Sequence, residues 1–536
     1  MSYFFKIASL PQEIIQIHQL NYQTFVEEIP QHTPNPERRL IDRFHDENTY
    51  LICLHEEKVV GMLAVRTQRP FSLDDKIDDL DQYLPFVPEK IVEVRLLAVD
   101  AKHRRGRIFY GLMRFLMRYL KKQGIDFAVI SGTTRELKLY HHFGFTPFAK
   151  RVGTKKAEYQ PMYLTYDTYR RSDAFRIIDM TSSYLAGPVG VEKHVYEAFA
   201  KEAKSHRNDE FIMQMKHIQK KLCSLTQVSH VQILLGSGTL ANDAVAAQLS
   251  LEPGCGLILV NGEFGKRLVD HASRFSLNFD ILEEAYGQPL SLDRIEELLK
   301  KKVYRWVWLV HCETSTGVLN DLPRMTRLGK KYGVQVVCDC ISSLGTVPCD
   351  LKDVFMATGV SGKAIGALTG LSFVFHKERI QPSSRLPRYL DLGMYQEWDS
   401  IPYSHSSNLM NALSVTLDQF TDSKVYEETS SMYDWVRNQL EQRLGLKILA
   451  PRDVSAPGIL TIELDPRLSS SRIGERMLDQ GFHLQFESSY LKQRNWLQVA
   501  FMGKIKRENF VRMLDSLEQV IKEGKDDFTQ TDCSTK

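Results

Sequence analysis

Hydrophobic residues follow different patterns in the two halves of the chain. In the first half, the apolar runs TYLICL (49–54) and VVGMLAV (59–65) are separated by a short polar turn, and IVEVRLLAV follows at 91–99. Runs of this length and composition predict strands, and the first two predict a hairpin. GLMRFLMRYLKKQ (111–123) has apolar residues at helical spacing and predicts an amphipathic helix, whereas DFAVIS (126–131) predicts another strand.

The second half alternates continuous apolar strands with amphipathic helices. GLILVN (256–261), RWVWLVH (305–311) and VQVVCD (334–339) are almost wholly apolar, and SLDRIEELLKKK (291–302) and MTRLGKKYG (325–333) have helical patterns. Strands without a polar face are typical of a parallel sheet that is covered by helices on both sides. The second half is therefore predicted to contain a mostly parallel sheet.

A polar stretch, TYDTYRRSDAFR at 165–176, separates the two patterns. We expect an α/β protein with at least two domains, which its length also favours. The predicted divisions are a mixed-sheet α+β domain (1–168), a linker (169–176), a domain with the mostly parallel sheet (177–420), a small α+β subdomain (421–524) and a polar tail (525–536).

Composition narrows the classes of partner. The formal net charge is +3 over 536 residues, so no nucleic-acid partner is expected. The 8 cysteines include no CxxC pair, and several lie in apolar runs, so we expect reduced thiols in a cytoplasmic protein and no metal centre. The N-terminus lacks an apolar signal region and no apolar run approaches about 18 residues, so no membrane span is expected.

One charged residue, Lys363, lies in the small and apolar stretch SGKAIGALTGLSFVF (361–375). Burial makes the charged form of an amine costly and lowers its pKa toward the neutral form, which can attack a carbonyl carbon. Lys363 is therefore a candidate Schiff-base lysine. The alternative is an ordinary lysine that reaches the surface at a strand edge.

Two other features of the second half suit a phosphorylated ligand. Asp339 ends the VQVVCD strand, at the carboxyl end where ligands gather in open α/β sheets. In LLGSGTLANDAVAAQL (234–249), a glycine-rich turn stands between a strand and a helix, so backbone N–H groups and hydroxyls could hold a phosphate. The residues of that turn are Gly236, Ser237, Gly238 and Thr239.

Two further segments carry hydroxyl and aromatic groups. HCETSTGVLNDL (311–322) crowds hydroxyls, including that of Thr314, directly after a strand. NGEFG (261–265) places Phe264 on a glycine-flanked turn, where its ring could lie flat on an aromatic ligand. The alternatives are helix caps for the hydroxyls and a core position for Phe264.

Together and in this order, these segments resemble the class V, fold type I pyridoxal-phosphate aminotransferases, in particular the branch of alanine–glyoxylate and serine–pyruvate transaminases. The resemblance runs from about 187 to 503 and includes AGPVGV (186–191) and HRNDEF (206–211). It implies pyridoxal 5'-phosphate as cofactor, a small-molecule amino donor, a keto or aldehyde acceptor, and a homodimer with shared sites.

The resemblance also implies roles for individual residues. Lys363 would form an imine with the cofactor and then shuttle the proton at Cα, and Asp339 would pair with the pyridine nitrogen so that the ring acts as an electron sink. Phe264 would stack on the cofactor, and Thr314 would lie near its ring oxygen or phosphate. The expected phosphate ligands are Ser237, Gly238, Thr239 and Ser404, the last donated by the second subunit.

Two positions depart from the family pattern. The family commonly has a glutamine before the lysine, and Gly362 stands there, which removes one phosphate contact. Members that act on α-amino acids usually clamp the substrate carboxylate with an arginine in an RIG-like motif, and Gln498 in NWLQVAFMG stands there. Either Arg494 replaces this clamp, or the substrate presents another group such as a bare amine, or the clamp has only drifted. The candidate substrate-binding residues are His206, Arg207, Arg494 and Gln498.

The first half carries a second family resemblance. VRLLAVDAKHRRGRIFYGLMRFLMRYL (94–120) is a strand, a basic turn and a helix whose free N–H groups could bind a pyrophosphate, and ELKLYHHFGF (136–145) is a short helix before another strand. The spacing resembles the GNAT acyltransferase fold over about 20–164, in particular the acyl-homoserine-lactone and N-acyl amino acid synthase branch.

This second resemblance implies an acyl donor, either acyl-CoA or acyl carrier protein. Tyr140 falls where family members often have a tyrosine that protonates the departing thiolate. Glu93, on the 91–99 strand, is a candidate base for the incoming ammonium group, and a structural carboxylate paired with Arg95 is the alternative. The loop pattern R/Q-x-x-G-x-G/A is present only in part, because Gly106 is its single glycine. The expected donor-binding residues are Arg104, Arg105, Gly106 and Arg107.

An amine-making site beside an amine-acylating site favours a bifunctional enzyme. In this hypothesis the second half transfers an amino group to or from a small compound and the first half acylates the amine, with fusion raising the local concentration of the intermediate. One alternative is pyridoxal-phosphate carbanion chemistry, such as a lyase, decarboxylation or condensation reaction, with the first half supplying the acyl group. Another is a first half that acts as a non-catalytic binding module.

Overall fold

The computed structural model describes residues 3–29, 31–104, 106–154, 157–175, 181–421, 423–503 and 506–533. The chain forms two compact units. Unit 1 comprises Met1–Thr181, Glu475–Phe482 and Asp515–Lys522, and unit 2 comprises Ser182–Gly474, His483–Leu514 and Glu523–Lys536. Within the described ranges, no helix is long and apolar enough to cross a membrane.

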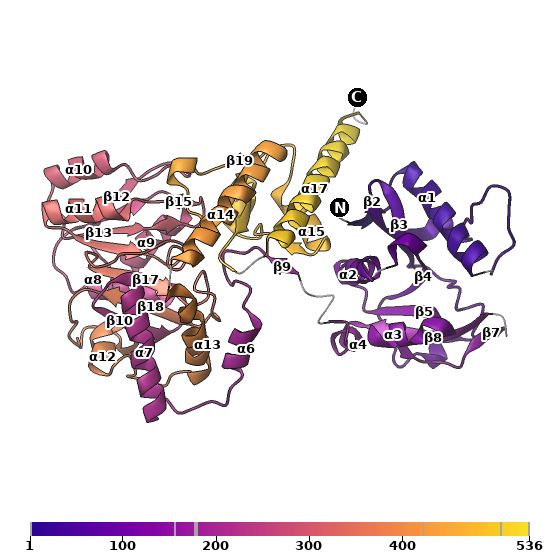
Figure 1. The fold of residues 1–536 in the computed structure, drawn as a ribbon, viewed down its shortest axis with the longest axis horizontal. Coiled ribbons are helices and arrows are strands. Elements are labelled where there is room, and N and C mark those ends of the chain that lie inside the picture. The colour runs from indigo at the N-terminus through magenta and orange to yellow at the C-terminus, as the bar shows by residue number, and fades with distance from the viewer. Residues whose placement is uncertain are drawn as a thin grey trace. The chain divides into compact units, whose positions relative to one another are not determined.

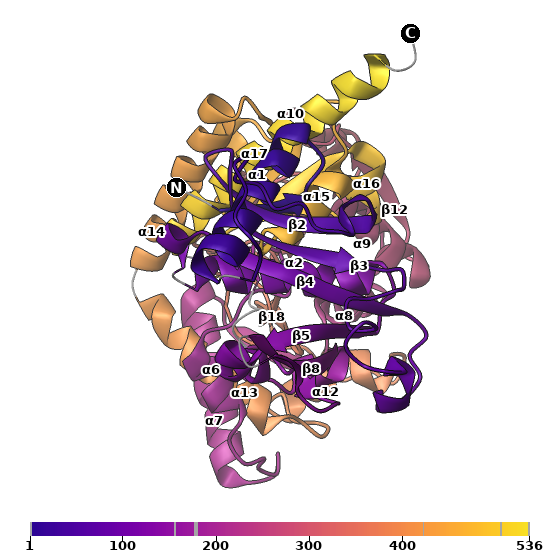
Figure 2. The same cartoon turned by 90° about the vertical axis from the view of Figure 1, so that its right-hand side faces the viewer.

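Unit 1 is built on an eight-stranded sheet in which β1-β2-β3-β4-β5-β8-β6 are neighbours in this order and β7 pairs with β8. Figure 2 shows β2, β3, β4, β5 and β8 following one another across this sheet. The predicted hairpin is confirmed as the antiparallel pair of β2 and β3. The strands are β1 (Phe4–Ile7), β2 (Asn48–His55), β3 (Lys58–Arg66), β4 (Ile91–Val99), β5 (Phe127–Thr133), β6 (Thr146–Pro147), β7 (Val152–Thr154) and β8 (Ala157–Thr165).

The central strands β4 and β5 of unit 1 run parallel but separate along their length. Their pairing joins Ile91 to Phe127 and ends where Glu93 meets Val129. Both strands continue within the described part of the chain, but no residue of β4 beyond Glu93 is paired with β5. Beyond this point the backbone N–H and C=O groups on the facing edges of β4 and β5 are not paired with each other.

Short helices cover the sheet of unit 1. The predicted amphipathic helix is confirmed as α2, and it begins earlier than predicted because Gly106 precedes it with a φ of 81° and ends the preceding turn. Its buried stripe includes Ile108, Leu112 and Leu116, which are spaced by one helical turn. The helices are α1 (Pro11–Tyr22), α2 (Arg107–Lys122), α3 (Leu137–His142) and α4 (Tyr166–Arg170).

The segment predicted to be a linker, 169–176, begins inside α4. Tyr169 and Ala174 are 2% and 0% exposed and belong to the hydrophobic core that α2 covers. A side chain buried in this core is held by it, so the packed part of the first half extends at least to Ala174. The other predicted divisions of the chain stay predictions.

Unit 2 contains the predicted mostly parallel sheet, with strand order β10-β18-β17-β16-β13-β11-β12 (Figure 1). Strands β17, β16, β13, β11 and β12 run parallel to one another, whereas β18 runs antiparallel to both β10 and β17. The strands are β10 (His230–Leu235), β11 (Gly256–Val260), β12 (Phe279–Glu283), β13 (Trp306–Val310), β16 (Gln335–Asp339), β17 (Met356–Val360) and β18 (Leu371–His376).

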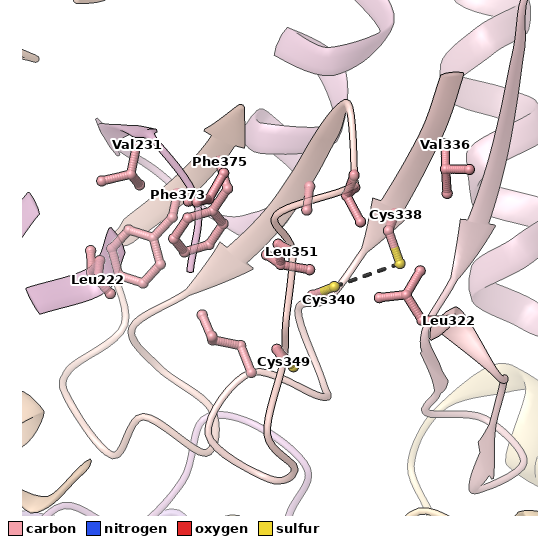
Figure 3. Packing of buried hydrophobic residues seen from close by; sticks show 14 of the residues in the cluster. Leu222, Val231, Leu322, Val336, Cys338, Cys340, Cys349, Leu351, Phe373 and Phe375 are labelled. Atoms are coloured by element: carbon pink, nitrogen blue, oxygen red, sulfur yellow. Dashed lines mark hydrogen bonds between the residues drawn. The ribbon is translucent and has the colours of Figure 1, made fainter. Parts of the chain in front are cut away.

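Helices pack on both faces of this sheet, as continuous apolar strands require. Along β13, Val307 and Leu309 join a core with α7, α10, α11 and α13, whereas Trp306, Trp308 and Val310 join a core with α8 and α9. Figure 3 shows the first of these cores around Cys338, Cys340 and Phe373. These helices are α7 (Asp209–Thr226), α8 (Gly238–Leu249), α9 (Glu263–Arg274), α10 (Leu292–Lys301), α11 (Leu322–Tyr332) and α13 (Ser407–Leu417).

The remaining elements of the second half include the predicted small α+β subdomain, whose three strands β19, β20 and β22 are antiparallel. These strands are β19 (Lys447–Ile448), β20 (Ile459–Glu463) and β22 (Trp496–Ala500). Short strands are β9 (Ser182–Ser183), β14 (Cys312–Glu313), β15 (Val318–Leu319) and β21 (Phe482–His483), and further helices are α6 (Lys193–Phe199), α12 (Leu392–Glu397), α14 (Lys424–Asn438), α15 (Ser470–Asp479), α16 (Ser489–Arg494) and α17 (Arg507–Cys533).

Candidate active site

A cavity of about 170 Å³ lies in unit 2 at the carboxyl ends of β13 and β16. Ligands collect at this edge of an open α/β sheet because the strands end there and the following loops diverge. The cavity brings together six residues that were predicted from distant parts of the sequence. They are Gly238, Thr239, Phe264, Thr314, Asp339 and Lys363.

Asp339 ends β16 and its carboxylate is held in one orientation. Its Oδ1 accepts a hydrogen bond from the backbone N–H of Ile341 at 2.9 Å, and its Oδ2 accepts one from Asn242 Nδ2 at 2.9 Å. Asn242 is fixed in turn, because its Oδ1 accepts from Thr358 Oγ1 at 3.0 Å. Each carboxylate oxygen keeps a further lone pair, so Asp339 can accept one more donor from a group inside the cavity.

Lys363 donates from its Nζ to Ser342 Oγ at 2.7 Å inside the cavity. Ser342 Oγ is also hydrogen-bonded to Thr314 Oγ1, so the amine is linked to the hydroxyl cluster after β13. Burial lowers the pKa of Lys363. A lowered pKa makes the neutral, nucleophilic amine more accessible, which is the property needed for attack on a carbonyl carbon.

The position before Lys363 has no room for a side chain, which explains the glycine there. A Cβ at Gly362 would lie 2.4 Å from Thr369 Oγ1 and 2.9 Å from Thr369 Cα. The glutamine that is common in the resembled family therefore does not fit this position without moving the backbone around Thr369.

Phe264 is positioned by a buried carboxylate. Glu313, which is 0% exposed, accepts hydrogen bonds from the backbone N–H groups of Phe264 at 3.3 Å and Gly265 at 3.0 Å, in the first turn of α9. It also accepts from the backbone N–H of Ser315 at 3.0 Å. Burial raises the pKa of Glu313. The helix N-terminus carrying Phe264 is thereby tied to the turn after β13.

We expect Gly262→Ala to destabilise the protein and to weaken ligand binding in the cavity. A Cβ at Gly262 would lie 2.4 Å from Glu313 Cγ and Cδ, so the carboxylate that holds α9 must shift. Overpacking of this kind costs about 1–3 kcal/mol, which urea denaturation would measure. Gly190→Ala is the control, because a Cβ there meets nothing within 4 Å. Equal unfolding free energies for both variants would contradict this account.

An anion could be held at the start of α8. Ser237 is the N-cap of this helix and makes no side-chain cap hydrogen bond, so its hydroxyl is not consumed by the helix. A Cβ at Gly238 would lie 2.5 Å from Ile341 Cδ1, so glycine allows α8 to approach the loop after Asp339. The first N–H groups of a helix lack partners within the helix, and they suit a phosphate at this position.

One of the candidate substrate residues, Gln498, forms hydrogen bonds within the protein itself. Gln498 is 0% exposed; its Nε2 donates to the carbonyl oxygen of Thr314 at 2.8 Å and to Thr461 Oγ1 at 2.9 Å, and its Oε1 accepts from Tyr490 OH at 3.2 Å. The amide thus ties β22 to the turn after β13.

The other candidates also lie apart from the cavity wall. The Arg494 guanidinium lies over Tyr286, with its Cζ 4.3 Å from the ring centroid. His206 and Arg207 precede α7, and Ser404 is an exposed residue before α13. None of these residues, all within the described ranges, lines the cavity in this subunit. Their binding roles stay predictions.

Sequence reasoning missed several residues on the cavity wall: Asn242, Arg267, His271, Cys312 and Ser342. The spacing of Phe264, Arg267 and His271 on α9 could have indicated a shared helix face. His271 is 7% exposed, and its Nδ1 is hydrogen-bonded to Asp243 Oδ1 at 2.6 Å. Burial raises the pKa of the Cys312 thiol to about 12, which keeps it protonated and unreactive.

In unit 1, Glu93 lies at the point where β4 and β5 separate, but its carboxylate is occupied. Its Oε1 accepts from Ser72 Oγ at 2.6 Å and from the Leu73 N–H at 3.1 Å, and its Oε2 accepts from the Ser72 N–H at 2.8 Å and lies 3.5 Å from Arg95 Nε. A general base needs a lone pair that faces the substrate. The geometry therefore favours the structural alternative for Glu93.

The predicted donor-binding loop of unit 1 is described in part. Arg104 forms an ion pair with Glu28 and donates to the carbonyl oxygen of Val99 at 2.8 Å, so its charge is partly compensated. Gly106 and Arg107 lie at the exposed start of α2, and Arg105 lies outside the described residues. On α3, burial raises the pKa of Tyr140. The phenol is therefore protonated at neutral pH and is a weaker acid than an exposed tyrosine.

Comparison with known proteins gives a separate line of evidence. The aminotransferase class-V family model matches residues 169–405, and the acetyltransferase (GNAT) domain model matches residues 20–114. The 2-aminoethylphosphonate–pyruvate transaminase of Pseudomonas fluorescens strain Pf-5 is 29% identical over 312 residues, which cover 55% of this chain and 83% of that protein.

Solved structures are similar to the part of the chain that the aminotransferase model matches. An alanine–glyoxylate aminotransferase from Nostoc sp. has a TM-score of 0.59 and 25% identity, and covers 64% of this chain and 95% of its own. The ureidoglycine–glyoxylate aminotransferase of Bacillus subtilis has a TM-score of 0.61 and 20% identity, over 64% of this chain and 94% of its own. The latter likeness concerns the fold alone.

Proposed function

We propose that this chain, which carries a class V aminotransferase domain and a GNAT acetyltransferase domain, transfers an amino group in its second half and acylates the resulting amine in its first half. The aminotransferase activity rests on the family match. The observation that carries the proposal for the site is the convergence of Lys363, Asp339 and Phe264 on one cavity.

The cavity residues fit pyridoxal 5'-phosphate. The half-buried amine of Lys363, with its lowered pKa, suits the aldehyde of the cofactor. The buried carboxylate of Asp339, which keeps free lone pairs, suits the pyridine nitrogen. The N-terminus of α8, with the unused hydroxyl of Ser237, suits the phosphate. When bound, this cofactor stabilises negative charge at the substrate Cα.

The protein's own groups would then do the following work. Lys363 would attach the cofactor and carry the Cα proton, with Ser342 accepting a hydrogen bond from its amine in the resting state. Asp339 would accept a hydrogen bond from the protonated pyridine nitrogen, and Asn242 would hold its carboxylate in one orientation. Ser237, Gly238 and Thr239 would bind the phosphate.

We propose a small primary amine as amino donor and a small keto compound as acceptor. Supporting this choice, the similar transaminase from Pseudomonas fluorescens is named for 2-aminoethylphosphonate and pyruvate. The cavity of about 170 Å³ also leaves little room beyond a cofactor and a short substrate.

In the first half we propose acylation from acyl-CoA or an acyl carrier protein, with Tyr140 protonating the departing thiolate. The half-buried Tyr140, which keeps its proton at neutral pH, and the separation of β4 from β5 support this assignment. We further propose a cytoplasmic homodimer in which Ser404 of one subunit reaches the phosphate of the other.

An absorbance titration tests the transamination. The purified protein with added cofactor should absorb near the edge of the visible range, and certain amines should bleach that band without any acceptor present. A long-wavelength band that accumulates without bleaching would instead favour carbanion chemistry, such as a lyase, decarboxylation or condensation reaction. Absence of any band after cofactor addition would contradict the cofactor assignment.

The coupling requires a separate experiment. A keto or aldehyde acceptor is added after the first titration to take up the amino group. The amine that forms is supplied with acyl-CoA or acyl carrier protein, and the free thiol released is measured. Wild type should release thiol with that amine, and Tyr140→Phe should release it at least about 100-fold more slowly. Thiol release that is unchanged in Tyr140→Phe would contradict the role of this residue, and no release from wild type would favour a non-catalytic binding module.

A further inference from the structure

The cavity wall contains a cation for which the proposed chemistry has no task. Among the described residues that line the cavity, the side chains that can carry positive charge are Lys363, His271 and Arg267. Lys363 is assigned to the cofactor, and the Nδ1 of His271 is hydrogen-bonded to Asp243. Arg267 remains without an assignment.

Arg267 is placed beside the reacting groups. Its Cζ lies 4.7 Å from the ring centroid of Phe264, and Lys363 Nζ lies 5.4 Å from the same centroid. A guanidinium in contact with an aromatic ring is held in orientation by the cation–π interaction. The planar donor fork of Arg267 is therefore presented at the ring that would pack against the cofactor.

The pKa shifts of two residues indicate that the positive charge of Arg267 also reaches the region around position 498, where the resembled family has its clamp arginine. Burial is the main cause that lowers the pKa of Lys363, and the positive charge of Arg267 lowers it further. Burial raises the pKa of Tyr490, and Arg267 opposes that shift. Tyr490 OH donates to Gln498 Oε1 at 3.2 Å. The positive charge of Arg267 therefore acts both on the reactive amine of Lys363 and on a residue that contacts Gln498.

Arg267 also has no carboxylate partner among the residues that the structure describes, unlike its neighbours on α9. Lys266 pairs with Glu283 at 3.1 Å, and Arg274 pairs with Asp270 at 2.8 Å. Arg267 is exposed at the cavity, so its N–H donors are available to an incoming anion. A carboxylate or phosphonate oxygen pair matches this fork in charge and geometry.

We propose that Arg267 binds the anionic group of the amino donor, a carboxylate or a phosphonate, in place of a clamp arginine at position 498. This inference rests on the proposed aminotransferase function and names its substrate class, namely small primary amines that carry an anion. The arginine comes from α9 of the sheet domain rather than from β22 of the small subdomain. Substrate recognition therefore does not require the small subdomain to supply a charge.

Matched pairs of donors test the proposal in the cofactor-loaded protein. One pair is alanine and alaninamide, and the other is 2-aminoethylphosphonate and its diethyl ester. For Arg267→Gln, the second-order rate constant of bleaching should fall about 10- to 100-fold with the anionic member and less than about 3-fold with the neutral member. The more reactive pair identifies the anion as carboxylate or phosphonate. Arg274→Gln on the same helix should leave all four constants unchanged.

Anion binding without turnover gives a second readout. Acetate and methylphosphonate, which carry no amine, should shift the absorbance band or the thermal unfolding midpoint of wild type at lower concentrations than those needed for Arg267→Gln. Equal losses for charged and neutral donors, or equal anion binding by both proteins, would overturn the proposal. Since this readout needs no reaction, it decides on Arg267 even if no donor bleaches the band and the aminotransferase proposal fails.

Discussion

Lys363→Ala should abolish the absorbance band of the cofactor-loaded protein and slow amino transfer by at least about 10³-fold. The substitution removes both the amine that would attach the cofactor and the group that would move the Cα proton, and proton transfer by a positioned side chain alone contributes about 10²- to 10⁴-fold. The amine is buried, hydrogen-bonded to Ser342 and lowered in pKa, so no exposed lysine provides the same environment.

The variant should remain folded, because removing a buried amine removes a costly charge rather than an apolar contact. Lys352→Ala is the matched control, since Lys352 is exposed and pairs with Asp350 at 2.6 Å. Absorbance spectra, single-turnover rates and urea midpoints would be measured for both. A Lys363→Ala protein that keeps the band and the rate of wild type would refute the assignment of the reactive amine.

Asp339→Asn should slow amino transfer by about 10²-fold or more and weaken cofactor binding. The amide cannot neutralise a protonated pyridine nitrogen, so the electron-accepting form of the ring loses its counter-charge. The local geometry adds a second cost. Asp339 accepts from both Ile341 N–H and Asn242 Nδ2, and an asparagine has one oxygen to serve these two donors.

The effect can be separated from loss of folding. Asp350→Asn changes an exposed carboxylate at its pair with Lys352 and should leave the spectrum and the rate unchanged. Cofactor affinity, followed by absorbance titration, should fall in Asp339→Asn by more than the loss of stability of the cofactor-free protein, measured by its unfolding midpoint, accounts for. If the variant binds the cofactor and reacts as wild type does, another group supplies the counter-charge.

Local sequence signals were sufficient to identify the candidate site residues whose role depends on a single strand, turn or helix. The apolar strand that ends in Asp339, the glycine-rich start of α8 and the isolated charge of Lys363 each stand out within about fifteen residues. Their convergence also followed from the sequence, because the carboxyl ends of parallel strands share one edge of the sheet. The family resemblance supplied the order in which the motifs occur.

Local signals were insufficient where the role depends on a tertiary partner. Gln498 aligns with a substrate clamp, yet its amide is occupied by Thr314, Thr461 and Tyr490, of which the first two are far away in sequence. Glu93 could be read as a base or as a structural acid until its contacts with Ser72 and Leu73 were known. Such contacts depend on the packing of separate elements rather than on residue spacing.

The partners of Gln498 also limit how this protein could change over generations. An arginine introduced there alone would place a charged group at a 0% exposed site and would abandon the acceptor role toward Tyr490. Only joint changes at neighbouring positions would make room for it, and residues in one hydrogen-bond network have strongly non-additive effects. A single substitution at position 498 is therefore poorly tolerated. Substitutions along α9 would change the substrate preference more readily.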